Sequence, residues 1–384
     1  DSSTVITHWA YQLTFTLADD EESSFRILLD DAHTDFILNL IRHSEHSKPQ
    51  QVAKSASAKK MLMSDLMQTI GILPILILIV AVFGFIAPNF FTESNLLNIT
   101  RQASINIVLA AGMTFVILTS GIDLSVGSIV AVSGVISVVA AMAGIPAPLA
   151  ILAGVGVGAL CGLLNGVLTA YLALAPFIVT LGTMTFLRGM AYTITEGQPI
   201  VSSSLSFREL GNGYLAGIPV PVIIMLVVYL LAWFILERTR FGRHIYAVGG
   251  NAQAARLAGV RVKRVLAAVY MIAGVCAGLA GIIFAARVIS AQPTAGTGYE
   301  LDAIAAVVLG GTSLAGGRGR IIGTLIGSII LGVLSTGLIL LSVPFFTQLL
   351  IKGIVIILAV AIDGLKQHPE LFTFWRKKEI ARTR

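Results

Sequence analysis

Long apolar stretches follow one another through most of this chain, and they restrict its fold more than any other feature. A helix of about 20 apolar residues crosses the ~30 Å hydrocarbon layer of a bilayer. Such stretches begin near Gln68, so we expect an all-α, polytopic membrane protein with about ten transmembrane helices. The predicted spans lie near residues 68–87, 103–120, 125–143, 149–172, 175–193, 219–236, 265–286, 302–315, 320–341 and 346–363.

Two places in this series are irregular. The stretch 302–315 is too short for a straight crossing, and only residues 121–124 separate the second span from the third. A broken or re-entrant segment at either place would change the count by one or two. Such breaks are tolerated only where they face protein or a water-filled cavity.

The balance of apolar and charged residues excludes a soluble globular protein. Apolar residues make up 56% of the chain and charged residues only 12%, which is about half the charged share of a water-soluble domain. Cys161 and Cys276 both lie in apolar runs, which excludes a disulfide scaffold and a cysteine-based metal site.

Charge divides the chain into unlike parts. Residues 1–60 carry nine acidic and six basic side chains, a net charge of −3, whereas 61–384 carry eleven acidic and twenty basic ones, a net charge of +9. We expect 1–60 to be a soluble acidic extension of unknown role, or a start-site artefact because no methionine precedes Met61. Residues 61–366 form the predicted membrane domain, and 367–384 a basic cytoplasmic tail.

Lys and Arg gather in alternate connections, which predicts the orientation of the chain. With the amino terminus in the cytoplasm, fifteen of these residues fall in inner segments, and the outer connections hold only Arg101, Arg208 and Arg287. Both termini are therefore expected to be cytoplasmic. The charge is confined to membrane-flanking segments, so the high isoelectric point requires no nucleic-acid partner.

Glycine recurs at every fourth position in three predicted spans. Small residues let helix backbones approach in a bilayer, so close helix packing is favoured over a glycine-lined path. The glycines are Gly154, Gly158, Gly162 and Gly166, then Gly274 and Gly278, then Gly323 and Gly327. Two runs rich in Thr, Ser and Gly, 118–127 and 309–317, suggest an inverted repeat near a solute route, although chance similarity explains them almost as well.

The chain lacks the motifs of catalysis and of nucleotide binding. It contains no H-E-x-x-H pair, no G-x-S-x-G nucleophile and no P-loop. We therefore expect no enzyme activity, no metal site and no cofactor bound by this chain. Any energy from nucleotide hydrolysis must come through another polypeptide.

A few polar groups within the apolar region are candidates for a solute path. Asp123, Glu300 and Asp302 lie beside turns whose donors and acceptors suit a polyhydroxylated solute, but Asp123 and Asp302 also stand where helix N-caps are expected. Asn165 is expected to make an interhelical hydrogen bond, and Lys352 and Asp363 to lie at the interface. Arg188 is also charged, but the sequence assigns it no role. The path candidates are Asp123, Ser125, Gln292, Thr297, Glu300 and Asp302.

Residues 237–264 form the most informative polar connection. Asn251 is expected to cap a short helix of small residues that ends at Gly259. Such a helix either docks in a groove of a partner protein or lies on anionic lipid. The residues that would make contact are Gly249, Asn251, Ala255, Arg256, Leu257 and Gly259.

Four stretches, 88–92, 119–128, 246–260 and 290–314, resemble the membrane permeases of bacterial ABC sugar importers. The resemblance covers about 61–366 and is specific to that family. It implies a non-catalytic permease of the inner membrane that acts as a homodimer and moves a monosaccharide. ATP and Mg²⁺ would bind to separate ATP-binding subunits, which would dock on the connection around Asn251.

The resemblance also implies a periplasmic sugar-binding protein, whose carboxylates we expect to meet Arg101, Arg208 and Arg287. Two alternatives remain. The first is an ion-coupled secondary sugar carrier that needs no ATPase, although the absence of histidine from the spans disfavours it. The second is a membrane scaffold that recruits a partner through residues 1–60.

Overall fold

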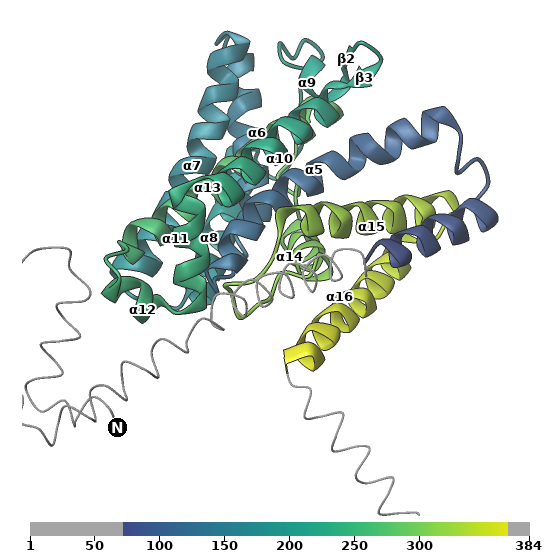
Figure 1. Ribbon diagram of the computed structural model, residues 1–384. Helices are drawn as coiled ribbons and strands as arrows, with labels where there is room; N and C mark the ends of the chain where they lie inside the picture. The colour runs from purple at the N-terminus through teal and green to yellow at the C-terminus, as the bar shows by residue number, and fades with distance from the viewer. Residues whose placement is uncertain (1–71, 368–384) are drawn as a thin grey trace, which may run out of the picture. The chain divides into compact units, whose positions relative to one another are not determined.

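The computed structural model describes residues 72–367, and helices make up most of that range (Figure 1). The expected all-α membrane fold is confirmed. Within residues 72–367, six helices are long and apolar enough to cross a bilayer: α5 (Glu93–Leu118), α7 (Ala147–Tyr171), α8 (Pro176–Ile194), α10 (Val220–Arg238), α13 (Val262–Val288) and α15 (Ile321–Leu340). The expected extension 1–60 and residues 368–384 of the expected tail lie outside the described range.

The other four predicted spans also correspond to helices. Three of them are the apolar helices Ile72–Ile86, α6 (Val126–Met142) and the apolar part of α16 (Phe345–Gln367). The eighth is α14 (Tyr299–Leu309), whose 11 residues would cover only about 16 Å along the helix axis. All ten predicted spans thus correspond to helices, but α14 is only about half as long as a full crossing requires.

Short elements join these helices. α9 (Glu209–Asn212) precedes α10, and α11 (Arg240–Gly250) and α12 (Ala252–Leu257) lie between α10 and α13. β1 (Ile200–Val201) pairs antiparallel with β4 (Ser290–Ala291), so the connection after α8 is tied to the one after α13. β2 (Tyr214–Leu215) and β3 (Ile218–Pro219) form a small hairpin.

Burial separates central helices from peripheral ones. The second half of α5 and most of α6 and α13 are buried, whereas α7, α8 and α10 expose long rows of apolar side chains. In water such exposure would be unfavourable, but hydrocarbon accepts it at no cost. α7, α8 and α10 therefore have the surface of helices that contact lipid or another membrane protein.

The glycine stripes pack helices against each other as expected. α7 lies along α13, and a Cβ atom at Gly158 would collide with the carbonyl oxygen of Gly274, just as one at Gly162 would collide with that of Tyr270. In the same way, a Cβ atom at Gly323 in α15 would collide with the carbonyl oxygen of Gly310 after α14. Only glycine permits these backbone separations, which confirms close packing at both stripes.

Candidate functional site

A non-helical segment interrupts the chain between α13 and α14. α13 ends at Val288, and Ile289 takes a left-handed conformation with a φ of 53°. Helical geometry returns only at Tyr299, after Gly296 and Gly298 with φ values of 70° and 83°, which glycine adopts without strain. Backbone of this kind is tolerated at membrane depth only beside protein or a water-filled cavity.

Arg188 of α8 holds this segment in place. Its Nη1 atom donates hydrogen bonds to the carbonyl oxygens of Pro293 at 2.6 Å and Ala295 at 2.8 Å. The side chain is only partly buried, and it lies about 18 Å along the helix axis from Pro176, the first residue of α8. An arginine inside an apolar span was the signal that sequence reasoning left unused.

Glu300 lies where the segment meets α6. Its Oε1 atom accepts a hydrogen bond from the backbone N–H of Gly298 at 3.2 Å. A Cβ atom at Gly127, in the first turn of α6, would collide with the Glu300 carboxylate and with the carbonyl oxygen of Gly296. The starts of α6 and α14 are thus in direct contact.

Three more polar side chains complete this region. Thr294 and Thr297 are exposed and Gln292 is partly buried, and the Thr297 hydroxyl donates to the carbonyl oxygen of Thr294 at 2.7 Å. We call Arg188, Gln292, Thr294, Thr297 and Glu300 the polar cluster. The cluster offers hydroxyl, amide, carboxylate and guanidinium groups, all of which hydrogen-bond to an uncharged polyol.

Asp123 and Ser125 do not line this surface, because both are fully buried. Asp123 Oδ1 accepts hydrogen bonds from the Ser125 backbone N–H at 2.9 Å and from its hydroxyl at 2.6 Å. Asn165 of α7 donates to the Ser125 hydroxyl at 2.8 Å and accepts from Thr183 of α8 at 2.7 Å. The expected interhelical bond of Asn165 is confirmed. Asp123 is not the N-cap of α6, which is Ser125, and its buried carboxylate instead holds the turn before that helix.

Asp302 is also engaged in a structural contact. Its carboxylate pairs with the Lys352 ammonium group of α16 at 2.8 Å, and the two side chains are only 9% and 21% exposed. This ion pair ties α16 to α14, and the expected position of Lys352 at the membrane interface stays a prediction. Nothing in the sequence joins these residues, which lie 50 positions apart. The side chain of Asp363 lies outside the described part of α16.

The connection between α10 and α13 has two capped helices. Thr239 caps α11 by accepting from Gly242 N–H at 3.1 Å, and Asn251 caps α12 by accepting from Ala254 N–H at 2.9 Å. After α12, Gly259 has a φ of 82° and its N–H bonds to the carbonyl oxygen of Arg256, as in a Schellman ending. The expected cap at Asn251 and the ending at Gly259 are both confirmed.

The α12 side chains point in different directions. Ala255 is 5% exposed and anchors the helix, whereas Leu257 is 90% exposed and Arg256 is also exposed. A large apolar side chain beside a cation on a rigid, capped helix is typical of a surface that contacts another protein.

The three predicted outer arginines lie at the other end of the long helices. Arg101 of α5 stacks over the Tyr214 ring, with 4.9 Å from its guanidinium carbon to the ring centroid. Arg208 pairs with Glu209 at 3.2 Å, at the exposed start of α9. Arg287, in the last turn of α13, lies against α9, where a Cβ atom at Gly211 would collide with its backbone. The structure therefore gathers all three around the segment that contains α9 and the β2–β3 hairpin.

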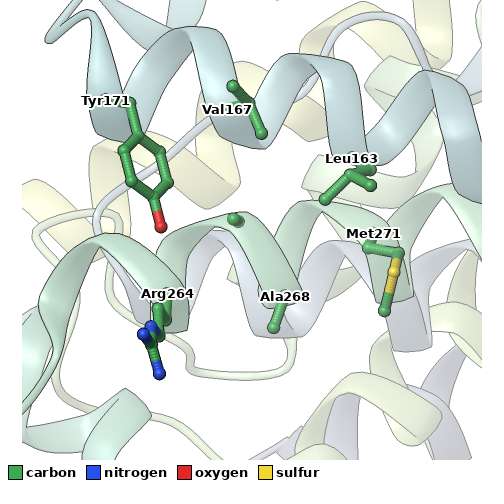
Figure 2. Close-up of a pocket in the computed structure, with 7 residues that line it drawn as sticks. Leu163, Val167, Tyr171, Arg264, Ala268 and Met271 are labelled. Atoms are coloured by element: carbon green, nitrogen blue, oxygen red, sulfur yellow. The ribbon is translucent and has the colours of Figure 1, made fainter.

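A shallow groove of about 390 Å³ runs between α7 and α13 (Figure 2). Leu163, Val167 and Tyr171 line one side and Arg264, Ala268 and Met271 the other. The groove is mostly apolar, and no member of the polar cluster reaches it. Its mostly apolar lining suits contact with lipid, and its polar side chains are Tyr171 and Arg264.

A helical membrane bundle with a broken segment and a polar cluster is the architecture of a solute permease. The described residues hold no group of His, Cys, Asp or Glu side chains that could bind a metal ion. Residues 95–360 match the family described as "Branched-chain amino acid transport system / permease component". The chain belongs to this permease family, as its sequence resemblance indicated.

Several characterised relatives cover most of the chain. It is 51% identical to the ribose import permease protein of Escherichia coli (strain K12) over 298 residues, which are 76% of this chain and 92% of the relative. It is 48% identical to the ribose import permease protein of Bacillus subtilis over 310 residues, 80% and 96% of the two chains. Identity to the fructose import permease protein of Rhizobium meliloti is 38% over 355 residues, 89% and 92%. No solved structure matches the chain.

Proposed function

We propose that this chain is the membrane-spanning permease of an ATP-driven importer for ribose or a related monosaccharide in the bacterial inner membrane. The high identity to ribose import permeases, over nearly their whole length, carries the proposal. This permease does not itself hydrolyse ATP. ATP and Mg²⁺ bind to a separate ATP-binding subunit, because the sequence contains no P-loop.

The polar cluster supports a solute route on one face of the bundle. Polar side chains and non-helical backbone cannot face hydrocarbon without a large cost in free energy. This face carries both, since Thr294 and Thr297 are exposed and Arg188 is partly exposed. A second copy of this chain covers that face and leaves a polar path between the two polar clusters. The permease therefore acts as a homodimer, and the path is incomplete in one copy.

The two ends of the bundle contact different partners. The α11–α12 connection and both termini lie in the cytoplasm, where exposed Arg256 and Leu257 dock on the ATP-binding subunit. Arg101, Arg208 and Arg287 lie outside and meet carboxylates of a sugar-binding protein. ATP binding shifts the equilibrium between the outward-open and inward-open forms only as far as ATP binds one form more tightly than the other.

Reconstitution in liposomes tests this function. The permease, its ATP-binding subunit and the sugar-binding protein should together accumulate labelled ribose, and omission of any component or of ATP should abolish uptake. Accumulation by the permease alone under an ion gradient would contradict the proposal and identify a secondary carrier. If the complete system transports allose or fructose but not ribose, only the proposed substrate changes.

A further inference from the structure

Gly249, in the last turn of α11, lies where three distant parts of the chain meet. A Cβ atom at Gly249 would collide with the carbonyl oxygen of Leu118, the last residue of α5, and would lie 2.6 Å from the backbone nitrogen of Gly317. Gly317 belongs to the connection between α14 and α15. The α11 backbone is thus in contact with both Thr/Ser/Gly-rich runs that interrupt the predicted spans.

Hydrogen bonds join the same two runs directly. The Gly317 N–H donates to the carbonyl oxygen of Leu118 at 2.9 Å, and the Ser120 hydroxyl donates to that of Ala315 at 2.6 Å. Ser120 has a φ of 62°, a conformation that a non-glycine residue adopts only when its surroundings hold it. We call Leu118, Ser120, Gly249, Ala315 and Gly317 the glycine joint.

The glycine joint connects onward to the elements around the polar cluster. Ser120 leads through Asp123 and Ser125 into α6, whose first turn touches Glu300. Ala315 and Gly317 follow α14, which begins beside Glu300. A displacement of α11 therefore reaches the polar cluster from two sides through backbone contacts, which transmit motion because packed backbones do not compress.

We propose that the glycine joint couples α11 to the two broken segments, and that Gly249 and Ser120 are positioning residues for sugar transport. This inference rests on the proposed function, in which the ATP-binding subunit docks on α12. ATP-driven movement of α11 carries the end of α5 and the α14–α15 connection with it as one unit. If the joint were loosened, the ATPase cycle would proceed without moving the segments that line the solute route.

Two adjacent glycines provide a matched test. Gly249→Ala forces α11 away from both runs, because the atoms in its way are backbone atoms that cannot rotate aside. Gly250→Ala makes the same chemical change on the same helix, where no atom lies within 4 Å of the added methyl group. Both variants are reconstituted with the ATP-binding subunit and the sugar-binding protein, and ribose uptake and ATP hydrolysis are measured in the same vesicles.

Gly249→Ala should lower the ribose transported per ATP hydrolysed by about tenfold or more while ATP hydrolysis continues, and Gly250→Ala should match the unmodified protein. Ser120→Ala removes the hydroxyl that donates to the carbonyl oxygens of Ala315 at 2.6 Å and Gly249 at 3.4 Å, and it adds no bulk. It should lower the ratio by a smaller factor. It serves as the deciding variant if Gly249→Ala does not assemble. An unchanged ratio in Ser120→Ala and in any assembled Gly249→Ala would overturn the joint. If the unmodified protein shows no ATP-dependent uptake, the proposed function fails first.

Discussion

At the scale of single residues, Arg188 shows how a side chain can stabilise a backbone that has no helix to satisfy it. The carbonyl oxygens of Pro293 and Ala295 have lost helical partners, and one guanidinium nitrogen serves both. Lysine carries the same charge, but its ammonium group lacks the planar fork of arginine. The position should therefore depend on geometry as well as on charge.

We expect Arg188→Gln to lower ribose uptake by about tenfold or more, because two carbonyl oxygens lose a charged donor worth at least 1–3 kcal/mol in total. Arg188→Lys should retain part of the uptake. Thr185→Ala is the control, because Thr185 is exposed on the same helix and its hydroxyl bonds only within α8. Uptake is normalised to the amount of folded permease, and normal uptake in Arg188→Gln would contradict this role.

The ion pair of Asp302 and Lys352 belongs to the same scale. Lys352→Met should destabilise the protein by about 3–5 kcal/mol, because it leaves a buried carboxylate without its partner. Adding Asp302→Asn should recover much of that loss. Thermal unfolding in detergent measures the stability of both variants.

Ribose uptake by the double variant then decides the role of Asp302. Recovery of uptake together with stability identifies a structural tie between α14 and α16. Recovery of stability without recovery of uptake would show that Asp302 takes part in the solute path.

At the scale of helices, glycine spacing determines which faces approach each other. Gly158 touches the α13 backbone, whereas Gly156, two positions earlier on α7, has no atom within 4 Å of an added Cβ atom. The same substitution should therefore have opposite consequences at neighbouring positions. Gly158→Ala should clearly lower the unfolding temperature, because overpacking reduces the free energy of unfolding by about 1–3 kcal/mol.

Gly156→Ala should leave the unfolding temperature unchanged or raise it slightly, because alanine favours the helical state over glycine. Size-exclusion chromatography after heating monitors both variants in one detergent. Equal losses in the two variants would argue against close α7–α13 packing.

The sequence predicts the helices better than their contacts. Apolar length located all ten spans, and small-residue spacing identified the faces of α7, α13 and α15 that pack closely. The roles of Arg188 and of the Asp302–Lys352 pair were missed because their partners are far away in the chain. The two-residue strands β1 and β4 are too short to produce a periodic pattern. The joint at Gly249 also needed the fold, because a glycine in a short helix does not reveal what approaches it.

At the scale of the whole molecule, the α12 surface and the three outer arginines lie at opposite ends of the same helices. α13 begins five residues after Leu257, and Arg287 lies near its far end, about 38 Å along the helix axis. Changes at one end should therefore impair one partner and spare the other.

Replacement of Arg101, Arg208 and Arg287 by Glu should abolish uptake that depends on the sugar-binding protein, because carboxylates would then face carboxylates. Copurification of the ATP-binding subunit should be retained. Arg256→Glu combined with Leu257→Asp should have the reverse pattern, with loss of the ATP-binding subunit and retention of sugar-binding protein docking. Unchanged docking after reversal of all three outer arginines would remove them from that interface.

A single continuous helix, α5, connects the two surfaces. Arg101 lies near one end of α5 and Leu118, beside Gly249, at the other, about 26 Å away along the axis. Docking of the sugar-loaded binding protein could raise the affinity for ATP through α5. Thermodynamic reciprocity then requires bound ATP to raise the affinity for that binding protein by the same factor. The coupling through α5 therefore has no preferred direction. The direction of transport comes from the irreversible hydrolysis of ATP.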